Sequence, residues 1–141
     1  MTSRIDALMA QMTIEEKVGQ LNVTADMVRP FVPDINPVAN EQNAGQVLEL
    51  IRQGKVGALF NGRGRQGAVA LQRVAVEESR LGIPLILAAD VIHGMGTVFP
   101  IPLGETATFE PDLARRTARA TAVEATAAAI HWTFAPAIDV T

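Results

Sequence analysis

Asp90 opens the segment Asp90-Val91-Ile92-His93-Gly94, which directly follows the apolar run at residues 85–89. An aspartate at the end of a buried strand can accept hydrogen bonds from two hydroxyl groups, and a charged acceptor holds them more strongly than a neutral one. This chemistry suits a sugar ligand. The same side chain could instead cap the following turn or pair with a neighbouring base, and the residues alone leave these alternatives open. Asp90 is therefore a candidate substrate-binding residue.

Other polar residues near predicted strand ends carry weaker signals. His93 lies beside Gly94 in a turn, where histidine commonly acts as a structural hydrogen-bonding group, and Asp139 follows a later strand as a turn residue. The two histidines, His93 and His131, are too far apart in the sequence to form a local metal motif, and there is no cysteine. We expect no metal site and no cofactor.

The segment Gly62-Arg63-Gly64-Arg65-Gln66-Gly67 is a literal G-x-G-x-x-G between a predicted strand and a predicted helix. Asp90 ends the next strand, near the position of the ribose-binding acid about 20 residues beyond such a fingerprint. Gly62, Gly64 and Gly67 with Asp90 therefore support an alternative, a dinucleotide-binding (Rossmann-type) domain. Against it, a long helical and loop region precedes the strand. The segment also fits a glycine-rich loop with two solvated arginines.

The elements that must position these residues alternate along the chain. We expect one partial domain over residues 1–141, with N-terminal helices at 1–21, a loop at 22–42 and the first strand–helix units at 43–141. Thr13 and Glu16 form a predicted capping box. Apolar spacing predicts helices near 47–54, 66–80 and 111–129, and continuous apolar runs predict buried strands at 55–61, 84–91 and 132–140.

This order of elements predicts an α/β fold with parallel strands and crossover helices. A closed (β/α)8 (TIM) barrel needs eight such units and roughly 250 residues. About three parallel strands would therefore form an incomplete N-terminal portion of a barrel, with exposed apolar faces and an unpaired edge. We expect the remainder of the barrel, or a complementary chain, to complete the sheet.

Composition excludes several classes of partner. The formal net charge is −3, with acidic and basic residues mixed along the chain, so neither nucleic-acid nor membrane-surface binding is predicted. The N-terminus lacks the apolar region of a signal peptide, and no apolar run reaches the roughly 18 residues of a membrane span. We expect a cytoplasmic protein as the sequence stands, or a periplasmic or secreted one if a signal was removed.

A series of short segments follows in order along nearly the whole chain. The segments are Met12-Thr13-Ile14-Glu15-Glu16-Lys17-Val18-Gly19-Gln20-Leu21, Gly54-Lys55-Val56-Gly57, Leu59-Phe60-Asn61, residues 71–84, Asp90-Val91-Ile92-His93-Gly94, Thr97-Val98-Phe99-Pro100 and Ile130-His131-Trp132-Thr133-Phe134-Ala135-Pro136. In this order and spacing, which are more specific than any one piece, they resemble the start of glycoside hydrolase family 3. The resemblance implies a retaining, exo-acting β-glucosidase that hydrolyses terminal non-reducing β-D-glucosyl residues of a β-glucoside or oligosaccharide.

In this family the aspartate that matches Asp90 binds hydroxyl groups of the sugar whose bond is cut. A retaining mechanism needs two carboxyl groups about 5–5.5 Å apart, and the resemblance places both the nucleophile and the acid/base downstream of Thr141. We therefore expect no catalytic residue in this chain and no activity from it alone. A non-catalytic sugar-binding or assembly partner is a further alternative.

The sequence departs from the family at two places. Met95-Gly96 stands where many members have an aromatic or polar residue and then a basic one, and residues 104–109 are unusually polar. We therefore expect a contact beside the sugar pocket to be missing or different from that of those members.

Overall fold

The computed structural model describes residues 3–29 and 43–136. Eleven elements follow one another in these ranges. In chain order they are α1 (Arg4–Gln11), α2 (Ile14–Gln20), β1 (Val23–Ala25), α3 (Ala44–Arg52), β2 (Ala58–Phe60), α4 (Arg65–Arg73), the π-helical turn η1 (Val74–Glu78), β3 (Ile86–Ala89), α5 (Pro102–Thr106), α6 (Pro111–Ala127) and β4 (Trp132–Thr133). Of the described helices, none is both long and apolar enough to cross a membrane.

Capping boxes start the first three helices. The predicted box at α2 is confirmed, because the Thr13 hydroxyl accepts from the Glu16 amide while the Glu16 carboxylate accepts from the Thr13 amide. Ser3 with Asp6, and Asn43 with Gln46, form the same reciprocal pairs at α1 and α3. Each box satisfies two backbone amides that lack a partner within the helix, so these helix starts are set by local sequence.

All strands in the described sheet run parallel, in the order β1-β2-β3-β4. The predicted α/β class is confirmed, with one strand more than expected. The additional strand, β1, lies in the segment predicted as loop and pairs Val23 with Ala58. Three residues are too short for a periodic signal, and pairing with β2 supplies the backbone hydrogen bonds that define the strand. Residues 30–42 of the predicted loop lie outside the described residues.

Element boundaries differ from the predictions at several other points. The helix expected at 66–80 divides into α4 and η1, and α5 forms where no helix was predicted, with Pro102 in its first turn. Proline suits a helix start because the missing amide would have had no partner there. The strand expected at 132–140 is regular only at Trp132–Thr133, and residues 137–140 lie outside the described part of the chain.

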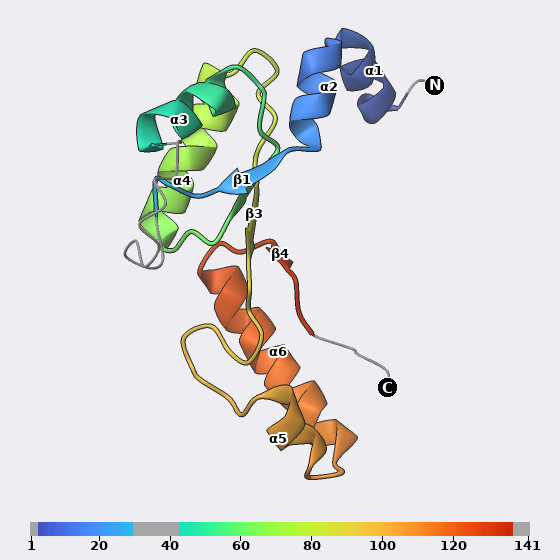
Figure 1. Ribbon diagram of the computed structural model, residues 1–141. Helices are drawn as coiled ribbons and strands as arrows, with labels where there is room; N and C mark the ends of the chain where they lie inside the picture. The colour runs from blue at the N-terminus through green and yellow to red at the C-terminus, as the bar shows by residue number, and fades with distance from the viewer. Residues whose placement is uncertain (1–2, 30–42, 137–141) are drawn as a thin grey trace.

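One face of the sheet carries the main hydrophobic core. Leu59 of β2 and Leu87 of β3 are opposite each other in the register and almost fully buried. They pack with Val47, Ile51 and Leu71, which come from α3 and α4. Figure 1 shows these two helices together on one side of the strands. On the opposite face the described residues bury Ala58 and Ala88 but leave the larger side chains partly exposed, so the strands that the sequence predicted to be covered on both faces are fully covered on one face only.

The opposite face is open among the described residues. Side chains alternate between faces along a strand, so Val23, Ile86 and Trp132 share the face away from Leu59 and Leu87. They are 42%, 47% and 43% exposed. β1 and β4 each pair with one neighbour only, so the described sheet also has two unpaired edges. This is the expected geometry of a barrel segment whose interior-facing side is uncovered.

The N-terminal helices are fastened to the end of η1 by a charged contact. Arg80 donates through Nε to the buried Glu16 carboxylate at 2.8 Å and through Nη2 to the Gln11 carbonyl at 2.9 Å. Hydrogen bonds from Arg80 and from the Thr13 amide lower the pKa of Glu16 below its ordinary value. A side chain at Gly19 would collide with the Gly54 carbonyl, so glycine permits the close approach of α2.

We expect the 141-residue chain alone to self-associate through the open sheet face. Ile86→Lys places a charge on that face, so it should shift the associated species to monomer at concentrations where the unmodified chain is associated. Sedimentation velocity at several concentrations measures this shift. Val69→Lys is the matched control, because Val69 is 55% exposed but lies on α4. A monomeric unmodified chain, or equal effects of both substitutions, would contradict the prediction.

Candidate functional site

Polar residues follow three neighbouring strands directly. Asp26 follows β1, Asn61 follows β2 and Asp90 follows β3. Because the strands are parallel, these three positions lie at the same end of the sheet, where the carboxyl ends of the strands meet; this is the carboxyl-terminal edge. Active sites of β/α barrels are built at this carboxyl-terminal edge. The three residues nevertheless have very different surroundings.

Asp90 is exposed between two buried neighbours, Ala89 and Val91. Its backbone amide donates to the Asn61 side-chain oxygen at 3.2 Å. Continuing the alternation of β3 by one residue places Asp90 on the open face with Ile86 and Ala88. Within the described ranges, its carboxylate forms neither a hydrogen bond nor an ion pair. The carboxylate is thus free to accept hydroxyl groups.

His93 closes the loop that follows Asp90. Its Nδ1 atom lies 3.0 Å from the Phe99 carbonyl oxygen, and the Phe99 amide donates to the His93 carbonyl at 2.8 Å. Gly94 has a φ of 118°, and a Cβ there would lie 1.8 Å from the Thr97 carbonyl oxygen. The structural hydrogen-bonding role predicted for His93 agrees with these contacts.

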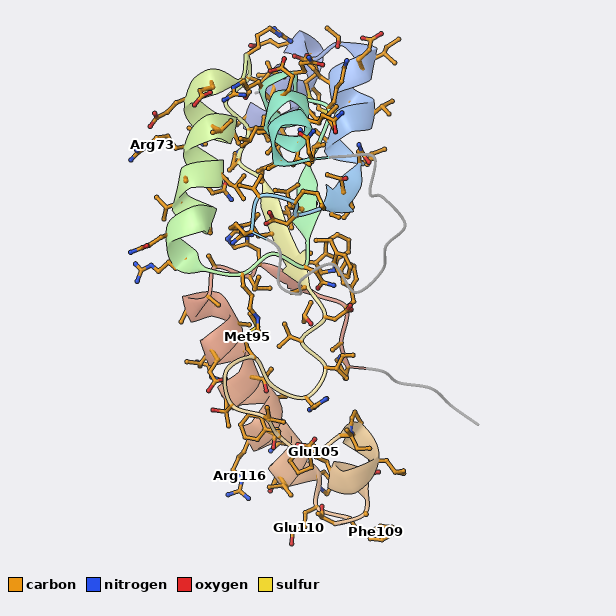
Figure 2. The ribbon with its side chains drawn as sticks, turned by 60° about the vertical axis from the view of Figure 1, so that its left-hand side comes forward. Arg73, Met95, Glu105, Phe109, Glu110 and Arg116 are labelled. Carbon is orange, nitrogen blue, oxygen red and sulfur yellow. The ribbon has the colours of Figure 1, made fainter. Side chains whose placement is uncertain are left out.

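Glu124 of α6 anchors the same loop. Its carboxylate accepts from the Thr97 hydroxyl at 2.6 Å, the Thr97 amide at 2.8 Å and the Gly96 amide at 2.9 Å. These hydrogen bonds, led by the Thr97 side chain, lower the pKa of Glu124 from 4.5 to about 2. Met95 packs against the small core around Val91, and Figure 2 shows it beside α6. Sequence reasoning missed Glu124, since a single acid in an Ala-rich helix carries no recognisable pattern.

The glycine-rich segment after β2 packs against a buried ion pair. The Asp26 and Arg29 side chains are 0% and 4% exposed, and Arg29 Nη2 lies 2.7 Å from Asp26 Oδ2. A Cβ at Gly62 would lie 1.9 Å from Asp26 Oδ2, and one at Gly67 would lie 2.6 Å from Arg29 Cδ. Asp26 and Arg29 therefore account for two of the three glycines in this segment. Sequence reasoning assigned no role to either residue.

These contacts weaken the dinucleotide-binding alternative. The side chains of Asp26 and Arg29 fill the space beside Gly62 and Gly67, where a bound pyrophosphate would approach the backbone. Gly64 alone is open on its side-chain face, with a φ of 99° at the start of α4. Nucleotide sites of such sheets lie where the strand order reverses, and the order of the described strands does not reverse.

A separate cleft of about 350 Å³ lies between α5, α6 and the segment after β3. Glu105, in the unusually polar segment, lines this cleft, and its Oε1 atom is buried without a hydrogen-bond partner among the described residues. Asp90 is not one of the lining residues.

The described residues contain no cluster of three potential metal ligands. Asp139 lies outside the described part of the chain.

Comparison with known proteins supports a carbohydrate-active family. Residues 13–141 match the family described as glycosyl hydrolase family 3 N terminal domain. The chain is 40% identical over 133 residues to the periplasmic beta-glucosidase of Salmonella typhimurium, and 29% identical over 153 residues to the lysosomal beta glucosidase of Dictyostelium discoideum. The matches cover 94% and 96% of this chain but only 16% and 18% of those proteins.

Solved structures show the same fold. The beta-glucosidase of Listeria innocua in complex with glucose matches with a TM-score of 0.76 and 31% identity, over 96% of this chain and 19% of that one. A mutant of the same enzyme in complex with laminaribiose matches with a TM-score of 0.73 and 29% identity, over 95% of this chain and 19% of that one. The chain therefore spans less than a fifth of the length of these relatives.

We predict that the Glu124 carboxylate stays ionised down to a pH of about 2. Because its pKa in the folded state lies below the ordinary 4.5, its contribution to stability is complete above pH 4.5 and is lost as the pH falls through about 2. Titration of the side-chain carbon signals by NMR measures this pKa. Thr97→Val removes the leading donor and should raise the pKa toward 4.5.

Thr126→Val is the control for this titration, because the Thr126 hydroxyl on the same helix donates to the Ala122 carbonyl instead. A Glu124 pKa near 4.5 in the unmodified chain, or equal shifts in both variants, would show that the loop contacts do not stabilise the carboxylate.

Proposed function

Since the chain belongs to glycosyl hydrolase family 3, we propose that it supplies the first strands and one sugar contact of a retaining, exo-acting β-glucosidase. The complete protein would release terminal non-reducing β-D-glucosyl residues from a β-glucoside or oligosaccharide. The observation that supports this most directly is the exposed Asp90 carboxylate at the carboxyl-terminal end of the sheet, which has no hydrogen-bond or ion-pair partner among the described residues. We assign to it the binding of sugar hydroxyl groups.

The relatives support the substrate class. All three relatives are named beta-glucosidases, and the Listeria innocua enzyme is solved with glucose and, as a mutant, with laminaribiose. A carboxylate suits such ligands because it can accept several hydroxyl donors and forms stronger hydrogen bonds than a neutral acceptor. Hydrogen bonds to sugar hydroxyls that strengthen as the ring distorts toward the transition state contribute to catalysis as well as to binding.

The catalytic carboxyl groups belong, in this proposal, to the rest of the complete protein. A retaining enzyme needs a nucleophile and an acid/base about 5–5.5 Å apart. Asp26 follows the neighbouring strand but is buried and paired with Arg29, and the Glu124 carboxylate accepts three hydrogen bonds from Gly96 and Thr97. Both therefore act in structure, and we infer that the chain alone binds sugar weakly and does not cleave it.

A second candidate is a non-catalytic assembly partner that binds sugar only in a complex. The partly exposed sheet face and the unpaired edges of the described sheet require a covering chain in this candidate as in the first, so catalysis by the complete protein is what separates the two. The Salmonella typhimurium relative is named periplasmic, which supports the periplasmic location over the cytoplasmic one for the complete protein.

We predict that the 141-residue chain does not hydrolyse a chromogenic β-glucoside, whereas the same gene extended to its natural stop codon encodes an active enzyme. The reason is that the extension supplies the carboxyl pair. Release of the chromophore by both purified proteins is the measurement. Activity in the short chain would place a carboxyl pair within it, and inactivity of both proteins would favour the assembly partner.

In the extended protein, Asp90→Ala should lower kcat/KM about 10²–10⁴-fold. Two hydrogen bonds to a charged acceptor are worth roughly 1.5–3 kcal/mol each, and each 1.36 kcal/mol corresponds to about a factor of ten. Asp112→Ala is the matched control, because Asp112 is exposed on α6 and, among the described residues, pairs with the exposed Arg115 alone. An unaltered rate for Asp90→Ala would refute the assigned role.

A further inference from the structure

Asn61, at the end of β2, forms two hydrogen bonds with the end of β3, next to the proposed sugar contact Asp90. Its backbone amide donates to the Ala88 carbonyl at 2.9 Å, and its side-chain oxygen accepts from the Asp90 amide at 3.2 Å. Both bonds go to the end of β3, on either side of Ala89. Asn61 alone therefore links the turn after β2 to the backbone on both sides of Ala89, including the Asp90 amide.

The backbone of Asn61 restricts which residue types can make this contact. Its φ of 61° lies in the left-handed region, which glycine, asparagine and aspartate adopt more readily than other residues. Glycine has no side-chain acceptor. Aspartate would add a second carboxylate next to Asp90, and like charges disfavour ionisation of both groups. Asparagine combines the required backbone with a neutral acceptor.

The turn that contains Asn61 is itself positioned by the buried pair of Asp26 and Arg29. Gly62, the next residue, is buried against Asp26, and the Arg63 amide donates to the Arg29 carbonyl at 3.0 Å. The buried pair of Asp26 and Arg29 thus places the turn after β2. Asp90, in contrast, has an exposed side chain, so neighbouring side chains contribute little to its orientation.

We propose that Asn61 is a positioning residue that orients the Asp90 carboxylate toward the sugar through its hydrogen bond to the Asp90 amide. The proposal rests on the assignment of Asp90 as a sugar contact. Small displacements of a positioned group can cost about 10²-fold in rate. The substitution that isolates this effect is Asn61→Gly, because glycine keeps the left-handed backbone and deletes only the acceptor.

The experiment measures kcat/KM of the extended protein on a chromogenic β-glucoside for Asn61→Gly, Asp90→Ala and the double variant. We expect Asn61→Gly to lower kcat/KM about 10–100-fold with an unchanged unfolding temperature. In the Asp90→Ala background it should have no further effect, because a residue that acts through Asp90 has nothing left to position. Phe109→Gly, the same substitution at an exposed left-handed residue, is the control and should leave the rate unchanged.

Each other outcome overturns a different claim. If Asp90→Ala lowers the rate but Asn61→Gly does not, or if the loss from Asn61→Gly is the same in both backgrounds, Asn61 is not a positioning residue. If Asp90→Ala leaves the rate unchanged, the proposed sugar contact itself fails. Should Asn61→Gly also lower the unfolding temperature, its effect on kcat/KM is compared in the two backgrounds well below that temperature, where both proteins are folded. A loss that persists in the Asp90→Ala background would assign Asn61 to stability alone.

Discussion

Parallel pairing of four short strands is the constraint on which the rest of this structure depends. Parallel strands require a crossover of a dozen or more residues between neighbours, and here α3, α4 and α6 lie in those connections. The same pairing brings the carboxyl-terminal ends of all four strands to one side of the sheet. Asp26, Asn61 and Asp90 therefore become neighbours although more than 25 residues separate each from the next along the chain.

At that edge a buried ion pair determines the shape of the loop beside Asp90. Asp26 and Arg29 are both desolvated, and such a pair is stable only when its geometry is good and its remaining polar groups are satisfied. Asp26 Oδ1 also accepts from the amides of Val28 and Arg29, and Arg29 donates to the Gly64 carbonyl. The glycines at 62 and 67 leave room for this pair. A pattern that resembles a phosphate-binding loop therefore has a packing explanation.

An aromatic cluster lies on the sheet face that the described residues leave partly exposed. The Phe134 ring contacts those of Trp132 and Phe60, with centroid distances of 4.6 Å and 5.3 Å respectively, yet Trp132 and Phe134 remain nearly half exposed. Apolar surface of this kind is stabilised by removal from water. The relatives, of which this chain spans less than a fifth, contain additional chain that could cover it.

The sequence by itself determined the α/β class, the parallel arrangement, the capping box at Thr13 and the place of Asp90 at a strand end, because these features follow from local periodicity and from short-range hydrogen bonds. Tertiary structure alone decided the strand at Val23–Ala25, the loop anchor at Glu124, and the contact between Asn61 and Asp90. Each of these depends on partners far away in the chain. The residues that neighbour a position in the sequence do not predict such partners, since these contacts form only when the strands and helices pack.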